Sequence, residues 1–249
     1  MKTSRPLIES TQFSDVLNYV DNDTVVLLDV DNTLIEPATN VGTIAWLDHY
    51  VTKLMEKGMD KIAAVKKVYK LWLPLQYKIT VKTVEKDISR VINQLHASGI
   101  KTMGLTARGF GMAEQTDKQL KSVDIVLENN TLHDDKIVFS EGEGFYKGVL
   151  SIFPGENKGK HLLAFFEHIN NFPKKVLFVD DKDFFIEEVG VALKRLNIDF
   201  TGIRYGGADD SFKTVDLQKA DEELVMYLGN DVKIDELFLP EQQQDMVQK

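Results

Sequence analysis

The segment 24–34 constrains the fold most, because an unbroken apolar run ends there in two aspartates and a turn. Residues 25–28 are β-branched and aliphatic, which is typical of a strand in a parallel sheet that is covered on both faces. Asp29 and Asp31 follow directly, and residues two apart in an extended chain point to the same side. Both carboxylates are therefore expected in one crevice at the carboxyl end of this strand, where open α/β sheets bind ligands.

The close spacing of these two acids indicates what chemistry they could perform. Two neighbouring carboxylates repel one another unless a cation lies between them or one retains a proton. A hard divalent ion such as Mg²⁺, which prefers oxygen ligands, would relieve the repulsion. One acid can then act as a covalent nucleophile while the other donates and accepts a proton. The alternative for this motif alone is a solvated loop, in which Asn32 and Thr33 begin a turn.

Apolar periodicity along the rest of the chain alternates between strand and helix patterns. Further strands are predicted at residues 100–106, 125–128, 136–140, 176–179 and 200–205, with a hairpin over 145–153. Helices are predicted at residues 84–95, 115–123, 162–169, 185–196 and 215–228. This β-α rhythm predicts a Rossmann-like parallel α/β sheet that is flanked by helices and connected by right-handed crossovers.

Residues 41–82 interrupt the rhythm with two helical patterns of their own. They are predicted to form a small helical cap inserted after the first catalytic strand, with residues 1–40 and 83–249 forming the α/β core. Trp46 and Trp72 lie in this insertion. Packing between helices is their expected role, and stacking on a substrate is the alternative.

Two further positions could bind an anion at the same edge of the sheet. The turn at 106–109 places the Thr106 hydroxyl and backbone N–H groups, including that of Ala107, where they could hold a phosphate. A simple strand-end cap is the alternative for Thr106. Lys158 begins a predicted helix, where the helix dipole disfavours positive charge unless an anion compensates it. Lys160 is the rival candidate, and the other interpretation is that both lysines are surface charges.

A second apolar strand, residues 176–179, also ends in a pair of acids, Asp180 and Asp181. If this strand neighbours the first, Mg²⁺ could take ligands from Asp29, from Asp31 through its backbone carbonyl, and from Asp180 or Asp181. The alternative is a surface aspartate cluster, but two strands that both end in paired aspartates favour a common site.

The four groups of candidate residues, taken in chain order, resemble the motifs of the haloacid dehalogenase-like hydrolase superfamily. Its phosphatases carry Asp-x-Asp-x-Thr, a strand-end Ser or Thr, a Lys and a final acidic pair. The matching residues here are Asp29, Asp31 and Thr33, then Thr106, then Lys158, then Asp180 and Asp181. The resemblance spans residues 25–205, and its details are similar to an uncharacterised bacterial branch of the superfamily.

The resemblance implies a Mg²⁺-dependent phosphatase that acts on a small phosphorylated substrate. Asp29 would attack phosphorus to form an aspartyl-phosphate, and Asp31 would protonate the leaving oxygen and then activate water. Thr106 and Lys158 would hold the phosphoryl oxygens. In the acidic pair, the register of the family selects Asp181 as the direct metal ligand. The acid at position 31 favours phosphatase over dehalogenase chemistry, and the cap would influence substrate choice.

The last motif departs from the family pattern. Many members place Asn or Asp a few residues after the acidic pair, where this chain has Phe184 and Phe185, and Asp183 is the candidate replacement. This departure supports one alternative function, a binding or effector module that keeps the fold with little or no turnover.

A nucleotide-cofactor enzyme is the second alternative function. Gly109 and Gly111 match the start of a dinucleotide-binding fingerprint, but Glu114 occupies the position of its third glycine. The mismatch makes this alternative the weaker of the two.

Composition limits the partners. The formal net charge of −9 would repel nucleic acid and anionic membrane surfaces, so a phosphorylated substrate must be attracted locally. Without cysteine the chain has no disulfide, thiolate nucleophile or cysteine zinc site.

Residues 1–13 lack the apolar core of a signal peptide, and no later stretch reaches membrane-spanning length. A cytoplasmic protein is expected as given, with an exported form that has lost its signal as the alternative. The oligomeric state is left open.

Overall fold

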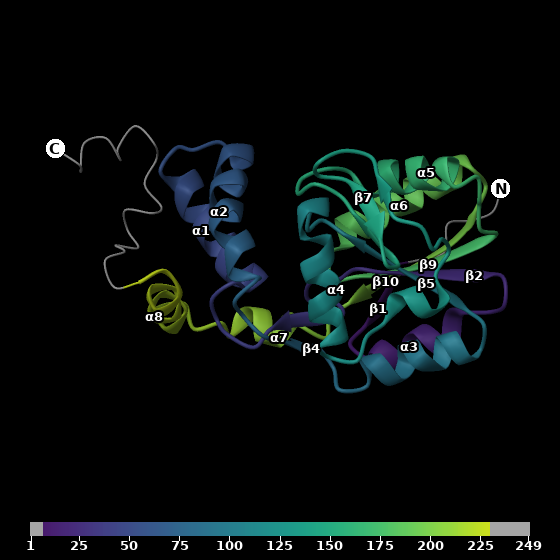
Figure 1. Ribbon diagram of the computed structural model, residues 1–249, viewed down its shortest axis with the longest axis horizontal. Helices are drawn as coiled ribbons and strands as arrows, with labels where there is room; N and C mark the ends of the chain where they lie inside the picture. Colours follow the sequence, from purple (N-terminus) through teal and green to yellow (C-terminus); the bar gives the residue numbers. More distant parts are fainter. Residues whose placement is uncertain (1–6, 230–249) are drawn as a thin grey trace. The chain divides into compact units, whose positions relative to one another are not determined.

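The computed structural model describes residues 7–229, which fold into two compact units (Figure 1). Within these residues, the first unit comprises 7–36 and 83–208, and the second comprises 37–82 and 209–229. A separate two-stranded sheet of β3 (Ile35–Pro37) and β4 (Val81–Thr83) lies where the chain passes between the units.

The first unit is built on an eight-stranded, mostly parallel sheet. Its order is β1-β10-β9-β2-β5-β8-β7-β6. The first six strands run parallel, and β7 pairs antiparallel with both of its neighbours, β8 and β6. In that order the strands are Ile8–Ser10, Asp199–Tyr205, Lys175–Asp180, Thr24–Leu28, Lys101–Thr106, Val149–Ser151, Gly144–Tyr146 and Ile137–Val138. The predicted α/β fold with a mostly parallel, helix-flanked sheet is confirmed.

Helices cover both faces of this sheet (Figure 1). Helices α5 (Lys158–His168) and α6 (Asp183–Arg195) lie on one face, and α3 (Ile88–Ala97) lies on the other. Helix α4 (Ala113–Lys121) follows β5 through a short 3₁₀ turn, η2 (Phe110–Met112). Another 3₁₀ segment, η1 (Phe13–Tyr19), connects β1 to β2.

The alternation of side chains along β2 and β9 directs the strand ends toward α5 and α6. Leu27 and Phe178 are fully buried and belong to the same core as residues of these two helices. They are partners in the parallel register of β2 and β9. Because side chains repeat every two residues along a strand, Asp29 and Asp180 emerge on that same face.

Residues 125–128 do not form the predicted strand. The chain turns after α4, where Asp124 has a φ of 61° and Ile125 N–H donates to Leu120 O at 3.0 Å, and it continues into the 3₁₀ segment η3 (Leu127–Asn130). The place beside β5 is taken by β8 instead. A short apolar run alone does not distinguish a strand from a packed turn.

In its described residues, the second unit contains four helices. They are α1 (Ile44–Glu56) and α2 (Lys61–Leu75), and α7 (Asp209–Lys213) and α8 (Leu217–Leu228). Trp46 and Trp72 are 0% and 2% exposed, which confirms their predicted packing role. Trp72 Nε1 donates to Gly42 O at 2.7 Å, so the polar atom of this ring is also satisfied.

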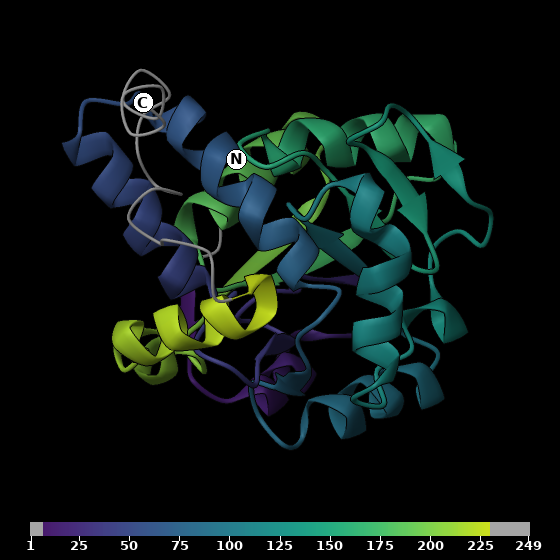
Figure 2. The same cartoon turned by 60° about the vertical axis from the view of Figure 1, so that its left-hand side comes forward.

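The C-terminal helices differ from the expected domain boundaries, because α7 and α8 group with residues 37–82 rather than with the sheet (Figure 1, Figure 2). Glu223 on α8 explains the grouping. Its Oε2 accepts the backbone N–H groups of Asn40 at 2.8 Å and Val41 at 2.9 Å. Tyr50 on α1 also donates to Asp221. The apolar stripe of a helix predicts that it packs, but not against which unit. Residues 230–249 of the predicted core lie outside the described residues.

Replacing Glu223 by alanine is expected to lower the free energy of unfolding by about 1–3 kcal/mol, because two backbone N–H groups lose a buried acceptor. Urea denaturation measures the change, and hydrogen exchange at Val41 should accelerate. Alanine at the exposed neighbour Glu222 is the control. Equal stability of the two variants would show that the contact of Glu223 does not hold α8.

Candidate active site

Two acidic strand ends lie side by side at the carboxyl edge of the sheet. Strands β2 and β9 pair in parallel with Leu28 opposite Val179, and Asp29 N–H donates to Val179 O at 2.9 Å. The pairing places Asp29 beside Asp180. These two side chains are buried, and Asp181 is half-buried. The predicted adjacency of the two strands is therefore confirmed.

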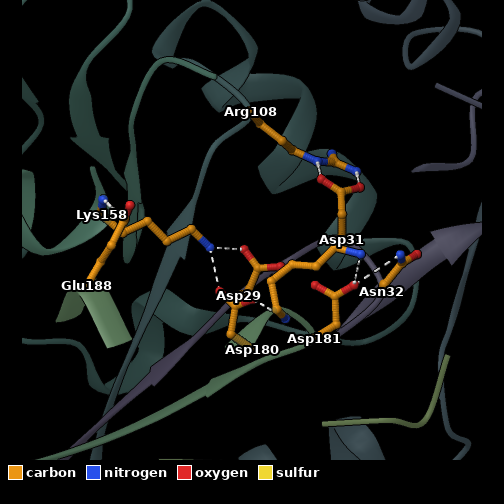
Figure 3. A network of polar contacts seen from close by, with 9 residues as sticks. Asp29, Asp31, Asn32, Arg108, Lys158, Asp180, Asp181 and Glu188 are labelled. Carbon is orange, nitrogen blue, oxygen red and sulfur yellow. Dashed lines mark hydrogen bonds and ion pairs between the residues drawn. The ribbon is translucent and has the colours of Figure 1, made fainter. Parts of the chain in front are cut away.

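Lys158 joins these two strand ends through its ammonium group (Figure 3). Its Nζ lies 2.6 Å from Asp29 Oδ1 and 2.7 Å from Asp180 Oδ2, and its side chain is only 1% exposed. The ring of Phe185 lies 4.2 Å from the same Nζ, so an aromatic face covers the ammonium. The alternative candidate, Lys160, is exposed.

The start of α5 is shaped to bring Lys158 into this position. Asn157 caps the helix by accepting Lys160 N–H at 2.8 Å, and Glu188 on α6 accepts Lys158 N–H at 2.9 Å. Gly159 permits the close approach of the two helices, since a Cβ there would lie 2.3 Å from Glu188 O. The glycine that follows the lysine thus has a packing role.

The negative charges of Asp29, Asp180 and Asp181 are not balanced by the positive charge of Lys158. Burial raises the pKa of Asp29 well above its ordinary value, with Asp180 and Asp181 adding to the rise and Lys158 opposing it. Burial likewise raises the pKa of Asp180 to about 6, against the opposing effect of Lys158. Burial alone would lower the pKa of Lys158, but the Asp180 and Asp29 carboxylates raise it. One buried ammonium therefore faces more carboxylates than it can neutralise.

The Asp31 carboxylate points elsewhere, toward Arg108 (Figure 3). Arg108 Nε lies 2.8 Å from Asp31 Oδ2, and Arg108 Nη2 lies 2.8 Å from Asp31 Oδ1. The argument from extended-chain alternation does not apply here, because β2 ends at Leu28 and Asn32 has a φ of 58°. The turn after the strand, closed by Leu34 N–H donating to Val30 O, redirects Asp31.

Arg108 is the residue at this site that the sequence analysis missed. It lies in the turn after β5 and is 1% exposed, and Gln119 Oε1 accepts from its Nη1 at 2.5 Å. Its position two residues after Thr106 was the available signal, since the same turn was expected to face the site. The buried guanidinium gives Asp31 a cation of its own.

Thr106 ends β5, the strand beside β2, and is 1% exposed. Ala107, the next residue, is half-buried. Two backbone N–H groups of the following turn donate to carbonyl oxygens of the protein itself, Gly109 N–H to Ile152 O and Phe110 N–H to Gly142 O. These two groups are therefore engaged where a dinucleotide fingerprint would need them for a pyrophosphate, which argues against the nucleotide-cofactor alternative.

The acidic group has the chemistry of a site for a hard cation. Asp29, Asp180 and Asp181 each offer a carboxylate oxygen, and these oxygens lie within 4.8 Å of one another. Both oxygens of Asp180 already accept a hydrogen bond, Oδ2 from Lys158 Nζ and Oδ1 from the Lys182 N–H at 2.8 Å. Asp181 has longer contacts, 3.3 Å from Asn32 Nδ2 and 3.3 Å from Lys182 Nζ. Asp29 and Asp181 thus remain the better placed direct ligands.

Asp183 lies outside this group. It is exposed, and its Oδ1 accepts the N–H of Phe184 at 2.8 Å. The carboxylate therefore binds the backbone at the start of α6. The ring of Phe185, two residues further along, covers the Lys158 ammonium.

The fold and these residues define an α/β protein with a buried aspartate group that could hold a metal ion. Residues 9–229 match the family model described as "Protein of unknown function (DUF2608)", and the chain belongs to that family.

Its relatives come from several bacteria. A Chlamydia trachomatis protein named "Putative outer membrane protein" is 26% identical over 77% of this chain and 72% of its own length. An uncharacterized protein of Rickettsia prowazekii is 26% identical over 80% and 76%, respectively. A solved hydrolase of the haloacid dehalogenase-like family from Streptococcus pneumoniae aligns with a TM-score of 0.46 at 11% identity, covering 73% of this chain and 94% of that chain. Between residues 7 and 229, no helix has both the length and the apolar character to span a bilayer.

Replacing Lys158 by methionine is expected to lower the free energy of unfolding by about 3–5 kcal/mol, because Asp29 and Asp180 would lose their shared buried cation. Methionine keeps most of the side-chain volume, so the loss reports charge rather than a cavity. The matched control is Lys160→Met, which removes an exposed lysine from the same turn and leaves its capping N–H intact. If urea denaturation gave the same midpoint for both variants, the ammonium would not be holding the strand ends.

Proposed function

We propose that this protein is a Mg²⁺-dependent phosphatase that hydrolyses a phosphomonoester through an aspartyl-phosphate intermediate. The observation that supports it most is the buried Lys158 ammonium shared by Asp29 and Asp180. This arrangement brings residues from three of the four sequence motifs, Asp29, Lys158 and Asp180, together at one edge of the sheet. It combines a candidate nucleophile, a cation that can hold a phosphoryl oxygen, and an acidic group suited to a metal ion.

In this proposal an oxygen of Asp29 attacks phosphorus, and the bond from phosphorus to the leaving oxygen breaks. Asp31, carrying a proton at that moment, donates it to the leaving oxygen. Asp31 then takes a proton from the water that attacks the aspartyl-phosphate, so inorganic phosphate leaves and the Asp29 carboxylate is restored. Since Asp29 Oδ1 is bound by Lys158, Oδ2 is the oxygen better placed to react.

Binding of the phosphoryl group falls to Lys158, the Thr106 hydroxyl and the Ala107 N–H. Mg²⁺ would be held by Asp29, Asp181 and the backbone carbonyl of Asp31, and would neutralise charge between nucleophile and substrate. Asp180, whose two oxygens accept hydrogen bonds from Lys158 Nζ and the Lys182 N–H, would orient the metal-binding group rather than coordinate the ion directly. Phosphoryl transfer depends mainly on such positioning and electrostatic stabilisation.

A binding or effector module with little turnover is the second candidate function. It is favoured by Asp183, which binds the backbone of α6 and so does not supply the late acidic group of the family pattern. Measured turnover of a phosphomonoester separates this candidate from the phosphatase.

Asp29→Asn is expected to abolish turnover of 4-nitrophenyl phosphate, because an amide cannot act as the anionic nucleophile. The rate should be measured with Mg²⁺ and with a chelator, and the wild-type rate should fall in the chelator. Asp183→Asn removes a carboxylate that is exposed and outside the group, and should retain most of the activity. Near wild-type turnover by Asp29→Asn would refute the proposed nucleophile.

Asp181→Asn is expected to raise the Mg²⁺ concentration needed for half-maximal rate far more than Asp180→Asn does. The reason is that both Asp180 oxygens are engaged by lysine donors, whereas Asp181 has weaker contacts. Loss of an orienting residue typically weakens metal binding or activity about 10- to 100-fold, and loss of the direct ligand should exceed this. Superimposable Mg²⁺ titrations of the two variants would contradict the ranking.

A further inference from the structure

Arg108 is buried in a manner that the roles assigned above do not explain. It stands in the turn between β5 and η2, its side chain is 1% exposed, and neither the metal group nor Lys158 requires it. Arginine is almost never fully buried unless it is paired. The identity of its partners therefore indicates its purpose.

Those partners come from two separate elements. Asp31, in the turn after β2, receives two parallel bonds of 2.8 Å from Nε and Nη2, so both carboxylate oxygens are bound. Gln119, on α4 and 4% exposed, accepts from Nη1 at 2.5 Å. A two-point contact from a planar guanidinium fixes the plane and the distance of a carboxylate, which a single ammonium cannot do. Gln119 in turn fixes the guanidinium.

This contact sets the direction of Asp31 relative to the other acids. Asp29, Asp180 and Asp181 each have an oxygen within 4.8 Å of the others, and the Asp31 carboxylate is not part of that group. In Figure 3 Asp31 points to Arg108, away from Lys158. The two aspartates of the first motif thus have separate cations, Lys158 for Asp29 and Arg108 for Asp31.

We propose that Arg108, held by Gln119, is the positioning residue for Asp31. The inference rests on the proposed phosphatase function, in which Asp31 gives its proton to the leaving oxygen. Donation leaves Asp31 as a carboxylate, and the guanidinium binds that form with both of its bonds. Arg108 therefore stabilises the charge that develops on Asp31 and holds the carboxylate ready to take a proton from the attacking water.

The test compares two esters that differ mainly in how much their leaving oxygen needs a proton. Phenyl phosphate needs protonation more than 4-nitrophenyl phosphate does. Arg108→Met is expected to lower kcat for phenyl phosphate by about a hundredfold and for 4-nitrophenyl phosphate by less than tenfold, with little change in KM. Gln119→Leu should shift the ratio of the two rates in the same direction by a smaller factor. Lys118→Met, an exposed change on α4, should leave the ratio unchanged.

A double-mutant cycle determines whether Arg108 acts through Asp31. In an Asp31→Asn background, Arg108→Met should lower the phenyl phosphate rate by less than threefold, because the carboxylate it serves is already gone. An equally large loss in both backgrounds would overturn the inference. So would an equal loss for both esters together with weaker inhibition by inorganic phosphate, since Arg108 would then bind the phosphoryl group.

Failure of the inference can be distinguished from failure of the proposed function. If active wild-type enzyme shows the same ester ratio as Arg108→Met and Gln119→Leu, only the inference is overturned. If wild-type enzyme is inactive toward both esters, the proposed function is overturned and the inference falls with it. Should Arg108→Met fail to fold by circular dichroism, Gln119→Leu decides the matter, because it retains the ion pair and loses only the support behind it.

Discussion

The ammonium of Lys158 is the interaction on which the site depends. It joins the start of α5 to the ends of two strands, because it contacts Asp29, which directly follows β2, and Asp180, the last residue of β9. Both carboxylates are buried. Burying either aspartate alone would be costly, because an isolated ionised carboxylate loses its hydration without compensation. Apolar residues of similar volume would often stabilise a core at least as well as a buried ion pair. The network is therefore easier to explain by chemistry at this edge than by stability.

The distribution of cations separates the two aspartates of the first motif. Asp29 shares Lys158 with Asp180 in a group that remains short of positive charge, so burial and its neighbours raise its pKa. Asp31 accepts two hydrogen bonds from a different cation, the Arg108 guanidinium. Two acids that are only two residues apart thus lie in different electrostatic environments. Such a difference allows one carboxyl group to act as nucleophile and the other to transfer protons.

The strands at the site could be predicted because each depends on a short apolar run in the sequence. The apolar runs before Asp29 and Asp180 gave two strands, and the parallel topology placed their ends together. What could not be predicted depends on contacts distant in sequence. Asp31 and Arg108 are 77 residues apart and meet because they follow the neighbouring strands β2 and β5. The strand rule does not cover the turn after β2 that contains Asp31, in which Asn32 has a positive φ.

The placement of α8 was missed for the same reason. Its apolar stripe showed that it packs, but its partner is set by polar contacts distant in sequence. Among them are the bonds from the Asn40 and Val41 N–H groups to the buried Glu223 carboxylate. A glutamate in the middle of a helix carries no signal of that contact. Charged residues that become buried are thus the least predictable part of both units, although they determine which elements meet.

Asn32, the residue directly after the two aspartates of the first motif, has a structural consequence of its own. Asn32 adopts a φ of 58°, a conformation that asparagine tolerates better than most residues, and this turn helps direct Asp31 toward Arg108. The same residue donates its side-chain amide to Asp181 Oδ2 at 3.3 Å. The turn after β2 therefore contains Asp31 and also contacts Asp181 through Asn32. Asn32 therefore connects the turn that contains Asp31 with the end of β9, where Asp181 lies.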